Sequence, residues 1–188
     1  MTDESIEQLV EEIQSGVEQL AKRSQRSLPV LHPPPSRDTL ASRIKQLPVP
    51  PPPSYLGFLT RHNGWDNFWI GYSLLGVDGP HTERALEDIR VTVDEDTWAQ
   101  KKYFPDQVAT KFAERERKKP NFVHLPNHII FATNFNGGLG VFDSRTRGDD
   151  LEMGVILWTP AGITDRHANF EAMLKAALRE TQAALQGS

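Results

Sequence analysis

The first residues of the chain have the spacing of an amphipathic helix over residues 3–24. Their apolar positions are Ile6, Leu9, Val10, Ile13, Val17 and Leu20. Apolar residues at three- and four-residue steps share one face of an α-helix, and Asp3 is a suitable N-terminal cap. Two interpretations stay open: the helix docks on its own domain, or it is presented to a partner or a second copy.

Two proline-rich segments, residues 28–35 and 48–53, cannot continue a helix. The first predicts a stiff, extended connector. Ser36 then caps a short helix with one apolar face. The apolar positions of that face are Leu40, Ile44 and Leu47. The second segment has the PxxP spacing of a polyproline ligand, but Pro53 also suits the first turn of a helix, so a linker that feeds a helix is favoured.

A helix over residues 55–62 and a strand over 68–75 are predicted next. Tyr55, Phe58 and Leu59 share the inner face of the helix, and the Asn-Gly pair at 63–64 ends it. The strand is rich in aromatic and branched residues. Alternation places Trp69 on the face opposite Phe68. That face is either covered, or open with Trp69 as a partner anchor.

The remaining pattern predicts an α+β fold. Residues 82–88 indicate a helical turn, 90–93 alternate, and 105–118 predict a helix. Three strands (129–135, 139–143 and 153–158) are joined by short turns, with a hairpin signal at Asn136-Gly137, and a closing helix spans 167–185. Short connections favour a mostly antiparallel sheet flanked by helices. We expect an N-terminal helix and linker over 1–35 and an α+β domain over 36–188.

Composition narrows the classes of partner. Apolar residues make up 38% of the chain and charged residues 24%, an ordinary globular balance. The net charge of −4 does not favour nucleic acid, whose phosphates need a concentrated positive face. There is no cysteine, which excludes disulfides and thiolate chemistry. Neither a signal peptide nor an apolar run of about 18–20 residues is present, so a cytoplasmic protein without a membrane span is expected.

The chain has no convincing pattern for catalysis, metal or cofactors. His124 and His128 have the spacing of metal ligands on a helix, but a proline lies between them. The glycines at 137–140 resemble a phosphate loop but lie between two strands, so a turn is expected. Asp143 and the pair Asp149-Asp150 could be paired acids, although turn formation and solubility explain them better. We therefore predict no catalytic, metal or cofactor-binding residue.

The segment Tyr55-Leu56-Gly57-Phe58-Leu59-Thr60-Arg61-His62-Asn63-Gly64, preceded by Leu47-Pro48, resembles the signature of the SUKH superfamily. That superfamily includes yeast regulators of cell-wall synthesis and bacterial immunity proteins. The apolar strand at 125–132, the turn at 136–138, the strand ending in Asp143 and the closing helix are similar in kind. The resemblance covers residues 40–182. It implies that the motif is structural, with Tyr55, Phe58, Leu59, Asn63 and Gly64 building the scaffold.

The resemblance implies a non-catalytic protein-binding domain, first of all an immunity protein that neutralises a cognate bacterial toxin. A basic toxin domain would suit the mildly acidic charge. The alternatives are a regulatory scaffold of a signalling or cell-wall pathway, suggested by the N-terminal helix and the proline segments, and an unrecognised enzyme. The segment 83–120, which matches nothing diagnostic of the superfamily, is one candidate region for partner binding. The other candidate partner-binding residues are Trp65, Asp66, Trp69, Asp143, Asp149 and Asp150.

Overall fold

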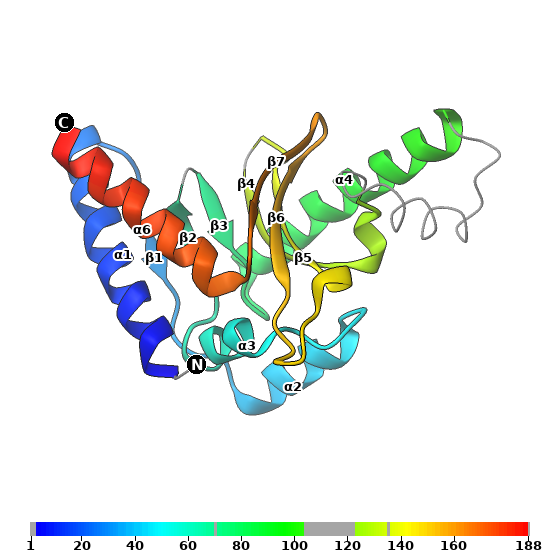
Figure 1. The fold of residues 1–188 in the computed structure, drawn as a ribbon, viewed down its shortest axis with the longest axis horizontal. Helices are drawn as coiled ribbons and strands as arrows, with labels where there is room; N and C mark the ends of the chain where they lie inside the picture. Colours follow the sequence, from blue (N-terminus) through cyan, green and yellow to red (C-terminus); the bar gives the residue numbers. More distant parts are fainter. Residues whose placement is uncertain (1–2, 70, 104–122, 135, 188) are drawn as a thin grey trace.

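The computed structural model describes residues 3–69, 71–103, 123–134 and 136–187 (Figure 1). The helices within these ranges are α1 (Asp3–Ser24), α2 (Arg37–Gln46), α3 (Pro53–Arg61), α4 (Pro80–Tyr103) and α6 (Phe170–Gly187). The strands are β1 (Val30–Leu31), β2 (Trp65–Trp69), β3 (Tyr72–Leu74), β4 (Ile129–Asn134), β5 (Leu139–Asp143), β6 (Gly154–Thr159) and β7 (Gly162–His167). Two short 3₁₀ helices, Leu125–Asn127 and Ser144–Thr146, flank β4 and β5.

The strands form one seven-stranded sheet in chain order, β1 to β7, and each neighbouring pair is antiparallel. The predicted α+β class is therefore confirmed. The three strands predicted in the last third of the chain agree with β4, β5 and β6 to within one residue at each end. The turn between β4 and β5 has Gly137 at a φ of +75°, as an Asn-Gly hairpin signal requires.

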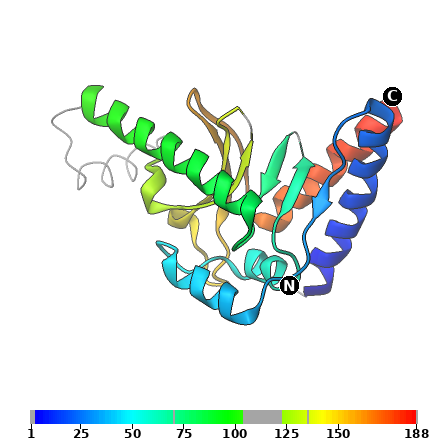
Figure 2. The same ribbon diagram turned by 180° about the vertical axis from the view of Figure 1, so that it is seen from behind.

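A separate apolar core covers each face of the sheet. Successive residues of β6 show the division, because Val155 and Leu157 join the core beneath α1, α3 and α6, whereas Ile156 and Trp158 join the core beneath α4. Figure 1 views the sheet from the side of α6, and Figure 2 views it from the side of α4. The strands from β4 to β6 are thus buried on both faces, which accounts for their nearly continuous apolar sequence.

Helix α1 docks on its own domain, which is one of the two interpretations left open by the sequence. Ile6, Val10 and Ile13 are buried in the larger core, and α1 runs beside α6 (Figure 1). The approach is close at Gly16, where an added Cβ would lie 2.5 Å from the Thr181 methyl group. The segment 1–35, predicted as a separate unit, therefore shares a core with the α+β domain.

Helix α3 carries the centre of the larger core. Tyr55 lies within 6.2 Å, between ring centroids, of four other aromatic side chains. Those partners are Phe58, Phe131, Phe142 and Phe170. The Tyr55 hydroxyl donates to the Leu75 carbonyl at 3.0 Å, and burial raises the pKa of this phenol far above its usual value despite the Arg43 charge. Edge and stacked aromatic contacts of this kind favour one defined packing.

A buried carboxylate holds the N-terminus of α3. Glu152 accepts hydrogen bonds from the backbone N–H of Ser54 at 2.8 Å and from its hydroxyl at 2.6 Å. The first turn of a helix has unpaired N–H groups and a partial positive charge, so a carboxylate is stabilising there. Pro53 takes the first-turn position predicted for it. Since Pro51 and Pro52 are buried, this proline segment feeds the helix and does not offer a free polyproline ligand.

The Asn-Gly pair after α3 meets the backbone that leaves β3. Gly64 has a φ of +91°, and an added Cβ there would lie 2.6 Å from the Gly76 nitrogen and 2.8 Å from the Leu74 carbonyl oxygen. The Asn63 side-chain oxygen accepts the Val77 N–H at 2.7 Å. An added Cβ at Gly76 would in turn collide with Asn63. Two chain segments therefore cross here with only hydrogen atoms between their backbones.

The predicted single strand over 68–75 is wrong, because that segment contains the last two residues of β2 and the whole of β3. β2 and β3 form a hairpin whose turn has Gly71 at a φ of +77°, and Trp69 pairs with Tyr72 across it. Both rings join the larger core, as does Phe68. The predicted placement of Trp69 on the face opposite Phe68 is thus wrong as well. Aromatic residues favour either strand equally, so the reversal left no signal in the apolar pattern.

Three further elements differ from the sequence prediction. β1 lies inside the predicted connector, and β7 precedes the closing helix predicted from residue 167. The alternation over 90–93 is not a strand, because α4 runs without interruption from Pro80 to Tyr103. The helix predicted over 105–118 lies outside the described residues. β1 and β7 are edge strands held by backbone pairing, which requires little apolar pattern.

The crossing predicts a large difference between two glycine positions. Gly64→Ala should lower the free energy of unfolding by about 2–4 kcal/mol, because a strained φ adds to a backbone collision. Gly79 is a matched control, with a φ of +95° and no atom within 4 Å of an added Cβ. Gly79→Ala should cost only about 1 kcal/mol. Urea unfolding measures both, and equal losses would show that the crossing imposes no constraint beyond φ.

Candidate partner-binding surface

Two of the six candidate residues are core residues. Trp65 is 0% exposed and Trp69 is 5% exposed. The Trp69 indole N–H donates to the Glu180 carboxylate of α6 at 3.1 Å, which ties the hairpin to that helix. An indole ring with no accessible surface cannot contact a partner in this structure, so the prediction of Trp65 and Trp69 as partner anchors is corrected.

The other acidic candidates occupy different surroundings. Asp66 of β2 is part-buried and contacts the His32 ring at 3.1 Å, beside β1. Asp149 and Asp150 are exposed in the turn before β6. Asp150 accepts the Glu152 N–H at 3.0 Å and so helps to shape this turn. The structure does not bring these side chains together with each other.

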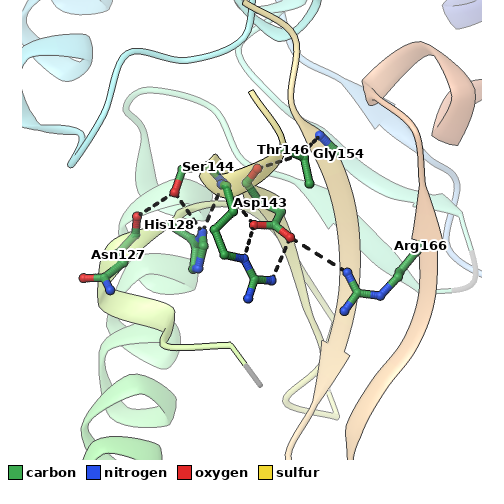
Figure 3. A network of polar contacts seen from close by, with 8 residues as sticks. Asn127, His128, Asp143, Ser144, Thr146, Gly154 and Arg166 are labelled. Carbon is green, nitrogen blue, oxygen red and sulfur yellow. Dashed lines mark hydrogen bonds and ion pairs between the residues drawn. The ribbon is translucent and has the colours of Figure 1, made fainter. Parts of the chain in front are cut away.

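Asp143, at the end of β5, is buried within a polar network (Figure 3). Its carboxylate accepts two hydrogen bonds from the Arg145 guanidinium, at 2.6 and 2.7 Å, and Arg166 of β7 approaches to 3.8 Å. Burial alone would raise the pKa of Asp143, but the hydrogen bonds and charge of Arg145 hold it below its usual value. A carboxylate held ionised in this way cannot act as a general acid near neutral pH.

A serine and a histidine meet in the same network. The Ser144 hydroxyl lies 3.3 Å from His128 Nδ1, the distance expected of a nucleophile and its base. The Ser144 backbone N–H, however, already donates to that nitrogen at 3.2 Å. The Nδ1 lone pair is therefore engaged by the main chain, and the pair closes the turn after β5. Thr146 completes the turn by accepting the Gly154 N–H at 2.7 Å.

The strongest candidate surface lies on α4, within the segment 83–120 that the sequence singled out. Ala85 and Ile89 anchor this helix to the core on its side of the sheet. Its C-terminal half extends past the strands in both views (Figures 1 and 2). Val91 and Trp98 are exposed there, at 47% and 59% of their surface. Exposed acidic residues accompany them on the helix: Glu83, Glu87, Asp88, Asp94 and Glu95.

A groove runs between α4 and the neighbouring part of the sheet, with a volume of about 550 Å³. The helix contributes the wall, which includes Asp88, Val91 and Thr92 and, towards the helix N-terminus, Arg84. Ser73 of β3 and the end of β4 contribute the polar side. From behind the sheet, no described helix lies in front of β2 and β3 (Figure 2). This combination of an open polar sheet face and an exposed apolar helix face suits contact with another protein.

The sequence contains helical spacing across this surface, but the sequence analysis divided it into a helical turn and an alternating segment. Residues 84, 88, 91, 95, 98 and 102 recur at three- and four-residue steps, which places them along one side of a continuous helix. Only two of them, Val91 and Trp98, are apolar, so the spacing does not stand out as an amphipathic pattern. The separate turn and alternating segment predicted here broke that continuity.

The chain is an α+β protein. No model of a known protein family and no curated protein matches it, so membership of the SUKH superfamily stays a prediction. Within residues 3–69, 71–103, 123–134 and 136–187, no helix has the length and apolar composition to cross a membrane. The same part of the chain contains no group of three or more His, Asp or Glu side chains arranged to share a metal ion.

The Asp143 network predicts a pH-dependent contribution to stability. Asp143→Asn should lower the free energy of unfolding by about 2–4 kcal/mol near pH 7, because the buried guanidinium contacts lose their charge. Since the folded-state pKa lies below the unfolded value of about 3.9, this contribution is present above about pH 4 and is lost at lower pH. Urea unfolding from pH 7 to pH 2 measures it. Asp149→Asn, an exposed neighbour, is the control, and a penalty independent of pH would contradict the assignment.

The exposed fractions of the tryptophan side chains predict which of them a soluble quencher of fluorescence can reach. The chain has four tryptophans, and Trp65, Trp69 and Trp158 are 7% exposed or less. Acrylamide should therefore quench only the emission of Trp98, and Trp98→Phe should remove the quenched component. Trp69→Phe serves as the comparison and should leave that component in place. Quenching that persists in Trp98→Phe would mean that a second indole reaches solvent.

Proposed function

We propose that the chain is a non-catalytic protein-binding domain of the immunity type, which neutralises a bacterial toxin by covering part of its surface. The resemblance of residues 40–182 to the SUKH superfamily supports this proposal. An antiparallel sheet flanked by helices is also the fold that the resemblance implies. The function then depends on a surface for protein contact and not on a reacting group.

The exposed apolar side chains of α4 carry the proposal. Val91 and Trp98 keep 47% and 59% of their surface open although both stand on a well-formed helix. Tryptophan is enriched among residues that dominate protein interfaces, because a large rigid ring loses little entropy on contact. The surrounding carboxylates favour a partner of positive charge. A basic toxin domain has this character.

The contacts of Asp143 support a non-catalytic role for the polar network around it. Its carboxylate is occupied by Arg145, and the nearby His128 nitrogen accepts a backbone N–H. Both groups serve the turn between β5 and β6. The paired-acid arrangement considered for Asp143 gains no support, because Arg145 occupies the Asp143 carboxylate and Asp149 is exposed in the turn before β6.

The scaffold alternative assigns binding to the first 50 residues. Deleting them would test folding and not binding, because Ile6, Val10 and Ile13 belong to the larger core. The outward face of α1 can be tested by substitution of its exposed acids, Glu11 and Glu12. A partner lost through Glu11→Lys and Glu12→Lys would favour the scaffold role.

The immunity function predicts protection from a toxin encoded beside the gene of this chain. Co-expression should restore the growth of cells that produce the toxin, and the purified proteins should form a stable complex. Calorimetric titration and growth measurements test both effects. A toxin from an unrelated locus should remain active and unbound. If no neighbouring toxin is bound or neutralised, the immunity function is wrong.

A further inference from the structure

The α4 contact face, defined as Glu87, Asp88, Val91, Asp94, Glu95 and Trp98, has carboxylates one turn away from its apolar centre, Val91, in both directions. The cations Arg84 and Lys102 lie at the two ends of the same side of the helix. Val91 lies one helical turn from Glu87 and Asp88 on one side and one turn from Asp94 and Glu95 on the other. All four acids are exposed. A side chain that covers Val91 is therefore placed next to carboxylates in both directions along the helix.

Trp98 extends this apolar centre by two further turns. Its ring already holds the Lys102 ammonium at 4.5 Å from the ring centroid, which is the geometry of a cation–π contact. The face therefore combines an aromatic ring that accepts cations with acids one turn away, at Asp94 and Glu95. Both features favour lysine or arginine side chains, which carry a positive charge at the end of an apolar chain.

The acids of the α4 contact face are not neutralised equally by the helix itself. Arg90 binds Glu87 at 2.6 Å, which is a short ion pair within the helix. Arg90 also lies within electrostatic reach of Asp94, whereas Asp88 and Glu95 form no ion pair with another residue in the described part of the chain. Carboxylates close together on one helix repel each other. A cation from outside the chain would relieve this repulsion, whereas an acidic partner would increase it.

The groove beside α4 provides space for a segment of another chain. Asp88 and Val91 belong both to the α4 contact face and to the wall of this groove. Ser73, Thr133 and Asn134 line the opposite side of the groove, and their side-chain oxygens already hold hydrogen bonds within the chain. Its volume of about 550 Å³ is in the range of protein sites that hold several side chains. A segment seated there would have polar contacts on one side and the apolar centre of α4 on the other.

We propose that the α4 contact face and this groove bind a cationic segment of a partner protein. Lysine or arginine side chains of the segment lie among Asp88, Asp94 and Glu95, and an apolar side chain covers Val91 and Trp98. This inference deepens the proposed function, on which it rests, by naming the surface and the chemistry of the toxin segment that it contacts.

The first experiment measures the affinity of the chain for the toxin encoded beside its gene. Asp88→Lys/Glu95→Lys should weaken binding by about 100-fold or more, since two attractive contacts become repulsive. Trp98→Ala should weaken it by about 10-fold or more. The matched control Glu11→Lys/Asp38→Lys changes the net charge by the same amount at exposed positions on other surfaces and should alter affinity by less than about 3-fold.

Salt dependence gives a readout that a loss of folding would not imitate. Between about 50 and 300 mM NaCl, affinity should fall steeply for the unmodified chain and for the control. The slope should be much smaller for Asp88→Lys/Glu95→Lys. Urea unfolding of each variant confirms that these exposed positions leave stability unchanged.

A second probe keeps the inference testable without a toxin. A fluorescein-labelled peptide of alternating lysine and leucine should bind the unmodified chain, and its glutamate–leucine counterpart should not. Binding should be lost in Asp88→Lys/Glu95→Lys and kept in Glu11→Lys/Asp38→Lys. Equal binding of the two peptides, or a cationic peptide that binds both variants alike, overturns the inference.

The outcomes separate the two proposals. If the toxin binds the unmodified chain and the α4 variants equally well, the contact face is wrong and the immunity function stands. If no toxin binds but the cationic peptide binds at α4, the immunity function is wrong and the chemistry of the face stands. Self-association that Trp98→Ala abolishes would show that a second copy occupies this face, and would overturn the inference.

Discussion

The structure depends on a crossing of two backbones, where the end of α3 passes the end of β3. Gly64 and Gly76 leave room for only hydrogen atoms between the chains, and Asn63 binds the Val77 N–H across the gap. The Tyr55 hydroxyl holds the Leu75 carbonyl one residue before Gly76. Helix α3 and the β2–β3 hairpin are therefore fixed to each other by main-chain contacts. The aromatic rings around Tyr55 then have a defined frame in which to pack.

Helices and strands that bury apolar side chains could be predicted from the sequence, and strands held only by backbone pairing could not. The stripe of α1 and the apolar runs of β4 to β6 reflect burial, which the sequence records directly. β1 has two residues, and β7 is largely exposed, so neither leaves such a record. The bond between Ser54 and Glu152 joins residues 98 positions apart. Contacts of that separation depend on the completed fold and have no local pattern.

The candidate site was predictable as a region but not in its details. The segment 83–120 was singled out because nothing in it matched the scaffold, and part of it forms α4 with its exposed Val91 and Trp98. Trp65 and Trp69 were chosen because tryptophan is common in interfaces. Composition cannot distinguish an indole that contacts a partner from one that fills a core. Both rings lie in the larger core, in a strand whose register shifts between Trp65 and Trp69, where Asn67 has a φ of +53°.

The division of α4 into an anchored side and an exposed side has a consequence for how such a protein can change over time. Ala85 and Ile89 hold the helix on the sheet, while Val91 and Trp98 contribute no buried surface to either core. Under the proposed function, substitutions on the exposed side would therefore alter partner choice at little cost in folding. A lineage built on this scaffold can follow a diverging partner through single replacements, each of which yields a folded chain.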